Sequence, residues 1–151
     1  MTRFAWIWSP GSQSGSEPCK GGYLSSPNVY AHHLNANQLD AVCLNSQIGV
    51  LAVKPSTYWE FAVPTKLFEY LPKGRPILVT EGTEAARIVS SFDAGWVVLY
   101  TAEAIAATLR RLQDNPAKVQ AKAANAASAA KVNTWADRAR TVADTLTGKS
   151  K

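Results

Sequence analysis

Glu69 is the residue of this sequence best suited to holding a small polar ligand. It lies inside a short helix predicted over residues 64–73, for which Pro64 suits the first position and Gly74 suits the position that ends it. A carboxylate on such a helix can accept two hydrogen bonds from a sugar diol. The sequence therefore predicts that Glu69 holds a ribose.

The start of the same helix would attract an anion. Its first N–H groups, at residues 63–66, have no partner within the helix, and the helix dipole favours negative charge at that end. The preceding loop, residues 54–63, follows a predicted strand, and open parallel sheets bind ligands beyond the carboxyl ends of their strands. A ribose carboxylate beside a phosphate site indicates a nucleotide.

The elements that must position these residues alternate along the chain. Apolar runs predict buried strands over residues 48–53, 77–80 and 96–100, with shorter candidates at 29–32 and at the aromatic stretch 4–8. Helices are expected up to about residue 44, from 84 to 92, from 102 to 112, from 116 to 131 and from 135 onward. We expect an α/β fold, a three-layer, Rossmann-like partial parallel sheet of about four to five strands with helices on both faces and a helical C-terminal third.

Helix caps can be read from the sequence at several positions. Thr83 is a predicted N-cap, Asn115 and Pro116 form an N-cap and first helical residue, and Thr134 with Asp137 resembles a capping box. The final helix is expected to bury one apolar face, formed by Trp135, Ala139, Val142 and Leu146.

The central block carries a family resemblance. The run PTKLFEYLPKGRPILVTEG at residues 64–82, followed by AGWVV at 94–98 and later by Trp135, resembles the nucleotide-sugar-binding C-terminal half of GT-B glycosyltransferases of the family 4 kind. That family has a glutamate-bearing helix before a Gly-x-Pro turn, a strand, a short Glu/Gly loop, a second strand and C-terminal helices with a tryptophan. The likeness covers residues 28–146.

The resemblance gives individual residues their expected roles. Glu69 matches the second glutamate of the family's paired motif, which holds the ribose hydroxyls of the donor. The first glutamate of that pair stands eight positions earlier, at what is Phe61 here, whereas Glu60 is displaced by one. Either the loop shifts to bring Glu60 in as a catalytic residue, or the backbone N–H groups of Phe61, Ala62 and Val63 replace it.

Two further sets of residues are carried over from the family. Thr65 and Lys66 resemble residues at the phosphate end of the donor, although an ordinary exposed helix lysine is the alternative for Lys66. The turn formed by Glu81, Gly82 and Thr83 is expected beside the donor sugar or pyrophosphate, with an ordinary strand-to-helix loop as the alternative.

The resemblance implies an enzyme, a glycosyltransferase. It would transfer a sugar, with retention, from a nucleotide diphosphate sugar built on UDP or GDP to a hydroxyl acceptor. The acceptor-binding domain and the first two strands of the donor half have no counterpart, so we expect this chain to be inactive alone and to need a separate chain for the missing half. The alternatives are a non-catalytic or partner-dependent module for nucleotide binding or interaction, a GT-B nucleotide-sugar epimerase, and an ordinary flavodoxin-like domain.

Length and composition set the remaining expectations. A chain of 151 residues with 46% hydrophobic residues suits one core domain, assigned to residues 28–151, and the aromatic then Gly/Ser-rich segment 1–27 fits a linker-like or disordered start. Neither the two cysteines, Cys19 and Cys43, nor the adjacent histidines show metal-ligand spacing. We expect Cys43 in the core, a cytoplasmic location, and neither metal nor cofactor.

Charge is concentrated in the last third of the chain. The net charge is +5, and residues 101–151 carry nine Lys or Arg against four Asp or Glu. Such a segment could attract an anionic membrane surface, which would give weak peripheral association with the inner membrane face. The alternative is that these charges lie on solvent-exposed helix faces without a binding role. Nucleic-acid binding is not expected, since no basic and aromatic motif is present.

Overall fold

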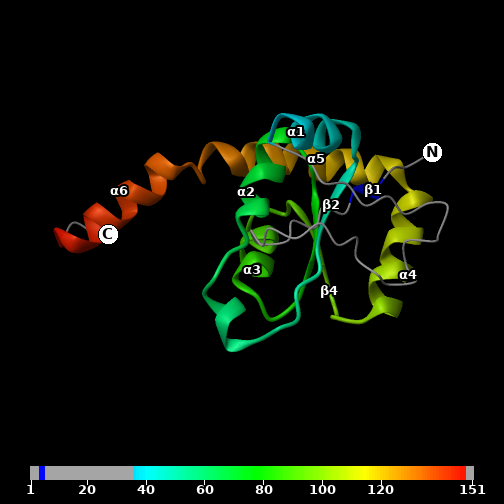
Figure 1. The fold of residues 1–151 in the computed structure, drawn as a ribbon, viewed down its shortest axis with the longest axis horizontal. Helices are drawn as coiled ribbons and strands as arrows, with labels where there is room; N and C mark the ends of the chain where they lie inside the picture. The colour runs from blue at the N-terminus through cyan, green and yellow to red at the C-terminus, as the bar shows by residue number, and fades with distance from the viewer. Residues whose placement is uncertain (1–3, 6–35, 149–151) are drawn as a thin grey trace, which may run out of the picture.

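The computed structural model describes residues 4–5 and 36–148 and shows an α/β fold, with a central parallel sheet covered by helices on both faces (Figure 1). The strands are β1 (Phe4–Ala5), β2 (Ile48–Leu51), β3 (Ile77–Thr80) and β4 (Gly95–Val98), side by side in chain order. Because β1 has only two residues, the sheet holds three full strands, fewer than the four to five expected. The predicted strand at 29–32 lies outside the described residues.

All neighbouring strands are parallel. Phe4 is opposite Ile48, Gly49 is opposite Ile77, and Ile77 is opposite Gly95. The first two residues of the aromatic stretch 4–8 therefore pair with β2, and the rest of that stretch lies outside the described residues.

Each helix expected in the described part of the chain is present. The helices are α1 (Ala36–Asn45), α2 (Thr65–Tyr70), α3 (Glu84–Ser91), α4 (Ala102–Gln113), α5 (Pro116–Lys131) and α6 (Trp135–Leu146), with short 3-10 helices η2 (Thr57–Glu60) and η3 (Leu71–Lys73). Some predicted boundaries differ by one or two residues, for example at the end of β2, which is Leu51 and not residue 53. Pro64 has ψ 130° and is the N-cap of α2 rather than its first helical residue.

The turn between η3 and β3 follows the prediction. Gly74 adopts the left-handed conformation with φ +61°, its N–H donates to the Leu71 carbonyl at 3.0 Å, and the Arg75 N–H reaches back to the Tyr70 carbonyl at 3.1 Å. This pairing of late N–H groups with earlier carbonyls is the usual helix end that glycine permits. It returns the chain directly into β3.

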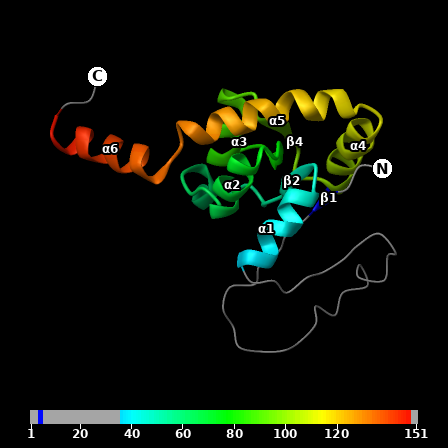
Figure 2. The same ribbon diagram turned by 90° about the horizontal axis from the view of Figure 1, so that it is seen from above.

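Alternate strand residues divide the core between the two faces of the sheet. One face buries Leu51, Ile77 and Val79 against α1, α2, α3 and the second half of α5, and Cys43 belongs to this core as expected. The other face buries Ile48, Val50, Leu78, Leu112 and Val119. The long α5 contributes to both cores because it runs across the sheet at the amino ends of the strands, as the view from above shows (Figure 2).

The prediction of a fully buried strand at 96–100 was wrong. The strand ends at Val98, its residues are mostly half-buried, and Val97 is 41% exposed. The reason is its position, since β4 is the last strand in the order and has one described neighbour only.

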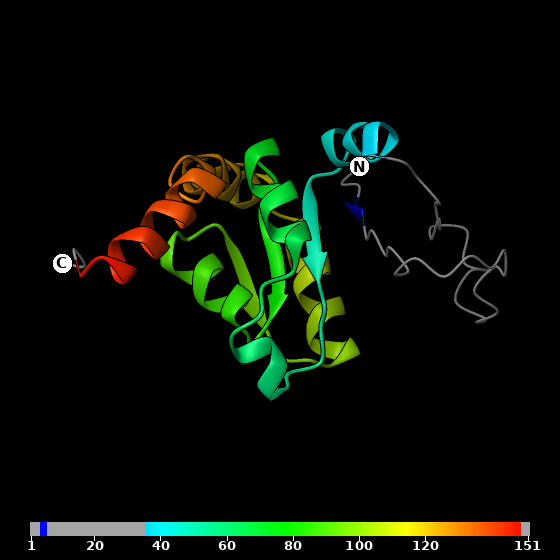
Figure 3. The same cartoon turned by 60° about the vertical axis from the view of Figure 1, so that its left-hand side comes forward.

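The prediction that α6 buries its apolar face was also wrong. Trp135, Val142 and Leu146 are 75%, 59% and 82% exposed, and Ala139 is exposed as well. The sixteen residues of α5 carry the chain past the helices that cover the sheet, so α6 projects beyond the body of the molecule (Figure 3). The predicted helical periodicity is present, and Trp135 approaches Phe68 of α2, but Val142 and Leu146 of the same apolar face stay exposed.

Candidate functional site

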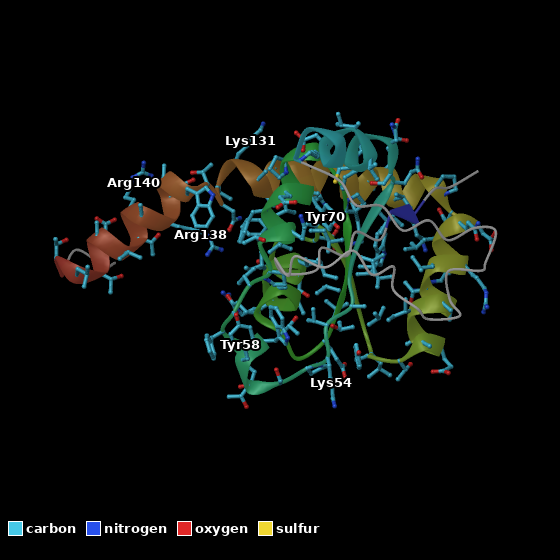
Figure 4. The ribbon with its side chains drawn as sticks, viewed as in Figure 1. Lys54, Tyr58, Tyr70, Lys131, Arg138 and Arg140 are labelled. Atoms are coloured by element: carbon cyan, nitrogen blue, oxygen red, sulfur yellow. The ribbon has the colours of Figure 1, made fainter. Side chains whose placement is uncertain are left out.

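An open hollow of about 490 Å³ runs along α3, from the turn at the carboxyl end of β3 to Val97 of β4. It is lined by residues from η2, from the β3–α3 turn, from α3 and from β4, namely Glu60, Glu81, Gly82, Thr83, Glu84, Ala86, Arg87, Ser90 and Val97. Four predicted site residues, Glu60 and the turn at 81–83, are thus brought together from separate segments. In Figure 4 this end of the molecule is marked by Lys54 and Tyr58.

The turn that forms one wall is held in place by its own hydrogen bonds. The Thr83 hydroxyl donates to the Thr80 carbonyl at 3.0 Å and accepts from the Ala86 N–H at 3.1 Å, which caps α3 as predicted. Gly82 has φ +67°, and a Cβ there would lie 3.3 Å from Pro55, so glycine permits both the turn and its approach to the loop after β2. The wall is therefore built before any ligand arrives.

The charges around the hollow favour hydroxyl groups over phosphates. Three carboxylates, of Glu60, Glu81 and Glu84, face one guanidinium, that of Arg87. The Arg87 Nε donates to Glu84 at 2.7 Å, and a second nitrogen also contacts this carboxylate. These hydrogen bonds are the main reason that the pKa of Glu84 is lowered. With its arginine already paired, the polar side chains of the hollow are chiefly acceptors, which suit sugar hydroxyls.

Glu69 does not line this hollow. Its Oε2 accepts a hydrogen bond from Lys66 Nζ at 2.8 Å, and its side chain is 36% exposed. Lys73 Nζ donates to the Glu69 carbonyl at 3.1 Å and forms an ion pair with Asp40 of α1 at 2.9 Å. No hydrogen bond to the second carboxylate oxygen of Glu69 is found within the described residues. Glu69 is thus held beside Lys66, with one oxygen open to a ligand.

The loop before α2 does not leave free the backbone N–H groups that were expected to bind an anion. The N–H groups of Phe61 and Ala62 both donate to the Tyr58 carbonyl, so they are not free in this structure. Val63 is half-buried and Thr65 is exposed at the start of α2. Of the predicted phosphate contacts, Lys66 provides the cation.

Exposed aromatic side chains beside the hollow were not singled out from the sequence. The ring centroid of Tyr58 lies 4.9 Å from that of Trp59 and 5.7 Å from that of Phe61, both in edge-on geometry. Phe61 is 70% exposed, and Glu60 lies between these residues in the chain. The dense aromatic spacing of residues 58–61 was the signal that could have revealed this surface, since exposed aromatic clusters commonly mark binding sites.

Within residues 4–5 and 36–148, no three His, Cys, Asp or Glu side chains are placed to hold a metal ion. None of the helices in these ranges combines the length and the hydrophobicity needed to cross a membrane. The two adjacent histidines and Cys19 lie outside the ranges. Compared with protein-family models, with curated proteins and with solved structures, the chain gives no match in any of the three.

Proposed function

We propose that this chain is the donor-binding half of a GT-B-type glycosyltransferase, with a Rossmann-like partial sheet that binds a nucleotide sugar at its carboxyl edge. The observation that carries the proposal is the end of the hollow that reaches this edge, where Glu60 and the turn 81–83 meet. Ligands of open parallel sheets bind in this position. The exposed acceptor oxygens of the hollow suit the hydroxyls of the donor sugar.

The nucleotide would lie along α2, beside Glu69 and Lys66. One Glu69 oxygen is engaged by Lys66 and the other can accept from a ribose hydroxyl. The Lys66 ammonium has three N–H donors, of which one is used by Glu69, so it can also contact a diphosphate oxygen. The same ion pair would then connect the ribose end and the phosphate end of the donor.

Transfer by this chain requires a second half. Sugar transfer places a donor and a hydroxyl acceptor in one geometry, and such positioning supplies much of the rate. The chain contributes the donor surface, with Lys66 available to stabilise the leaving diphosphate. The acceptor surface would come from outside these 151 residues, so we expect them by themselves to bind donor weakly and not to turn over.

Isothermal titration of the full chain with UDP and with GDP tests this function. We expect saturable binding of one nucleotide, with a Kd on the order of 10⁻⁴ M or weaker. Glu69→Gln should weaken that binding roughly tenfold, because a charged acceptor for the ribose hydroxyls is lost. Glu103→Gln is the matched control, since Glu103 is exposed on α4 and lines no part of the hollow.

Three results would contradict the proposal in separate ways. If neither nucleotide binds at millimolar concentration, or if Glu69→Gln leaves binding unchanged, the donor site is wrong. Sub-micromolar binding with measurable sugar transfer by the isolated chain would instead refute the need for a second half.

A non-catalytic, partner-dependent module is the second candidate, and the exposed apolar face of α6 favours it. Such a module would keep binding a partner through α6 while failing to bind UDP or GDP. The same titrations therefore separate the two functions.

A further inference from the structure

A second hollow, of about 180 Å³, lies where α2, η3, α5 and α6 meet. Its lining is Phe68, Pro72, Ala130, Asn133, Thr134, Trp135 and Arg138, and none of these residues lines the hollow at the strand ends. The space is smaller than a typical small-molecule pocket, which is about 300 Å³ or more, and suits a single side chain.

Arg138 is the charged group of this second hollow, and its guanidinium has neither an ion pair nor a hydrogen bond from Nε among the described residues. The guanidinium carbon lies 4.3 Å from the centre of the Phe68 ring. The Nε atom is buried without a hydrogen-bond partner, and no ion pair of Arg138 is found among the described residues. Glu84 is close enough for Arg138 to help lower its pKa, but its hydrogen bonds go to Arg87. A buried donor without a partner is unfavourable until an acceptor reaches it.

The exposed apolar residues of α6 continue from the same hollow. Trp135, Val142 and Leu146 are separated by seven and four residues, which places them on one side of the helix, with Arg138 next to Val142. Trp135 and Arg138 belong both to the hollow and to this side of α6. Figure 4 shows Arg138 and Arg140 leaving α6 in different directions, and Arg140 is paired with Asp137 at 3.0 Å.

The helix that presents this surface is formed in advance. The Thr134 hydroxyl accepts from the Asp137 N–H at 3.1 Å, and the Asp137 carboxylate accepts in return from the Thr134 N–H at 3.3 Å. This capping box satisfies backbone groups at the start of α6. A partner that binds this helix would therefore not have to provide the free energy for folding it.

We propose that the α6 face, defined as Trp135, Arg138, Val142 and Leu146 with the second hollow, binds a protein segment that carries an Asp or Glu between apolar residues. The acidic side chain enters the hollow and accepts hydrogen bonds from Arg138, while its apolar neighbours cover α6. The guanidinium fork matches a carboxylate, and the partly buried position of Arg138 strengthens such a pair. The proposal does not depend on nucleotide binding.

Other occupants fit this face less well. A second copy docked about a two-fold axis through this face would bring its own Arg138 toward the first, and the like charges would repel. A membrane surface would favour a basic helix, yet α6 carries Asp137 and Asp144 alongside its two arginines. A protein segment with an acidic residue between apolar ones would pair with the charge of Arg138 and cover the exposed apolar residues of α6.

Selection of a phage-displayed library of random twelve-residue peptides on the full chain tests the proposal. We expect the enriched peptides to share an Asp or Glu flanked by apolar residues. Replacing that acid with its amide in a synthetic peptide should weaken binding roughly tenfold to hundredfold, as measured by fluorescence anisotropy.

Variants of the chain locate the contact. Arg138→Gln should weaken peptide binding by the same factor as the amide peptide, and the two changes together should add little more. Arg138→Lys should retain part of the affinity, since it keeps the charge without the fork. Arg140→Gln is the matched control and should leave binding unchanged, and circular dichroism of each variant checks that α6 remains helical.

Enrichment of peptides without an acidic residue, or affinity indifferent to Arg138→Gln, would overturn the proposal. So would binding to phosphatidylserine-containing vesicles that Arg138→Gln abolishes, which would assign the face to a membrane. Concentration-dependent self-association that Leu146→Asp abolishes would assign it to a second copy.

Discussion

At the scale of single residues, Gly49 shows how closely β2 and α2 are packed. A Cβ at this position would lie 2.4 Å from a ring carbon of Tyr70, well inside contact distance. Tyr70 is itself almost completely buried, and this burial raises the pKa of its hydroxyl. The ring of Tyr70 thus fills the space that a larger residue at 49 would need, and this contact sets the separation of α2 from the sheet.

Gly49→Ala should therefore lower the free energy of unfolding by about 1–3 kcal/mol, the usual range for overpacking a filled core. Urea unfolding followed by circular dichroism measures the change. Adding Tyr70→Leu to Gly49→Ala should recover part of the loss, because the clash is removed. An unfolding midpoint unaffected by Gly49→Ala alone would show that the ring moves aside without strain.

At the scale of an element, α6 depends on its first turn, since its side chains are largely exposed. The carboxylate of Asp137 accepts hydrogen bonds from the side chain and then the backbone of Thr134, and these are the main causes of its lowered pKa. A carboxyl group whose pKa is lower in the folded state stabilises that state above its ordinary pKa of about 3.9, and the contribution is lost as pH falls through the lowered value. The start of α6 should consequently loosen in acid.

Thr134→Ala should raise the pKa of Asp137 toward its ordinary value and reduce the hydrogen-exchange protection of the first α6 amides by about fivefold. Titration of the carboxyl carbon by NMR and exchange at neutral pH measure the two effects. Glu84 is the internal control, because its pKa is lowered by Arg87 and should not respond. If the pKa of Asp137 stays low in the variant, Thr134 is not its cause.

At the scale of the whole molecule, the structure consists of a layered body and a projecting helix. Ala129 is the last residue along the chain whose side chain belongs to either core, and no residue of α6 is fully buried. The contacts between α6 and the body include the approach of Trp135 and Arg138 to Phe68. The stability of the body should thus be largely independent of α6.

Ending the chain after residue 132 should shift the midpoint of thermal unfolding by no more than about 4 °C, a change that corresponds to roughly 1 kcal/mol or less for a domain of this size. The same truncation should abolish selection of acidic peptides, because the α6 face is removed. Calorimetry of the full and shortened chains measures the shift. A much larger loss of stability would mean that α6 belongs to the folded body.

Local chemistry made much of the fold predictable. The caps at Thr83 and Thr134, the Pro116 start of α5 and the Gly74 turn each depend on a few adjacent residues, and all four occur as expected. The strand at 77–80 was predicted to the residue because its apolar run is bounded by turn residues on both sides. Part of the candidate site was predictable as well. Glu60 lies in the loop between β2 and α2, and the turn 81–83 lies between β3 and α3, and loops that follow parallel strands meet at one edge of the sheet.

The sequence by itself determined which segments form helices and strands and which side of each is apolar, because these properties come from neighbouring residues. Only the tertiary structure decided what each side meets. It separates Glu69 from the hollow that holds Glu60, leaves β4 half-buried, and leaves Val142 and Leu146 of α6 exposed. Burial and site geometry depend on elements distant in sequence, and periodicity carries no information about whether a second surface is present.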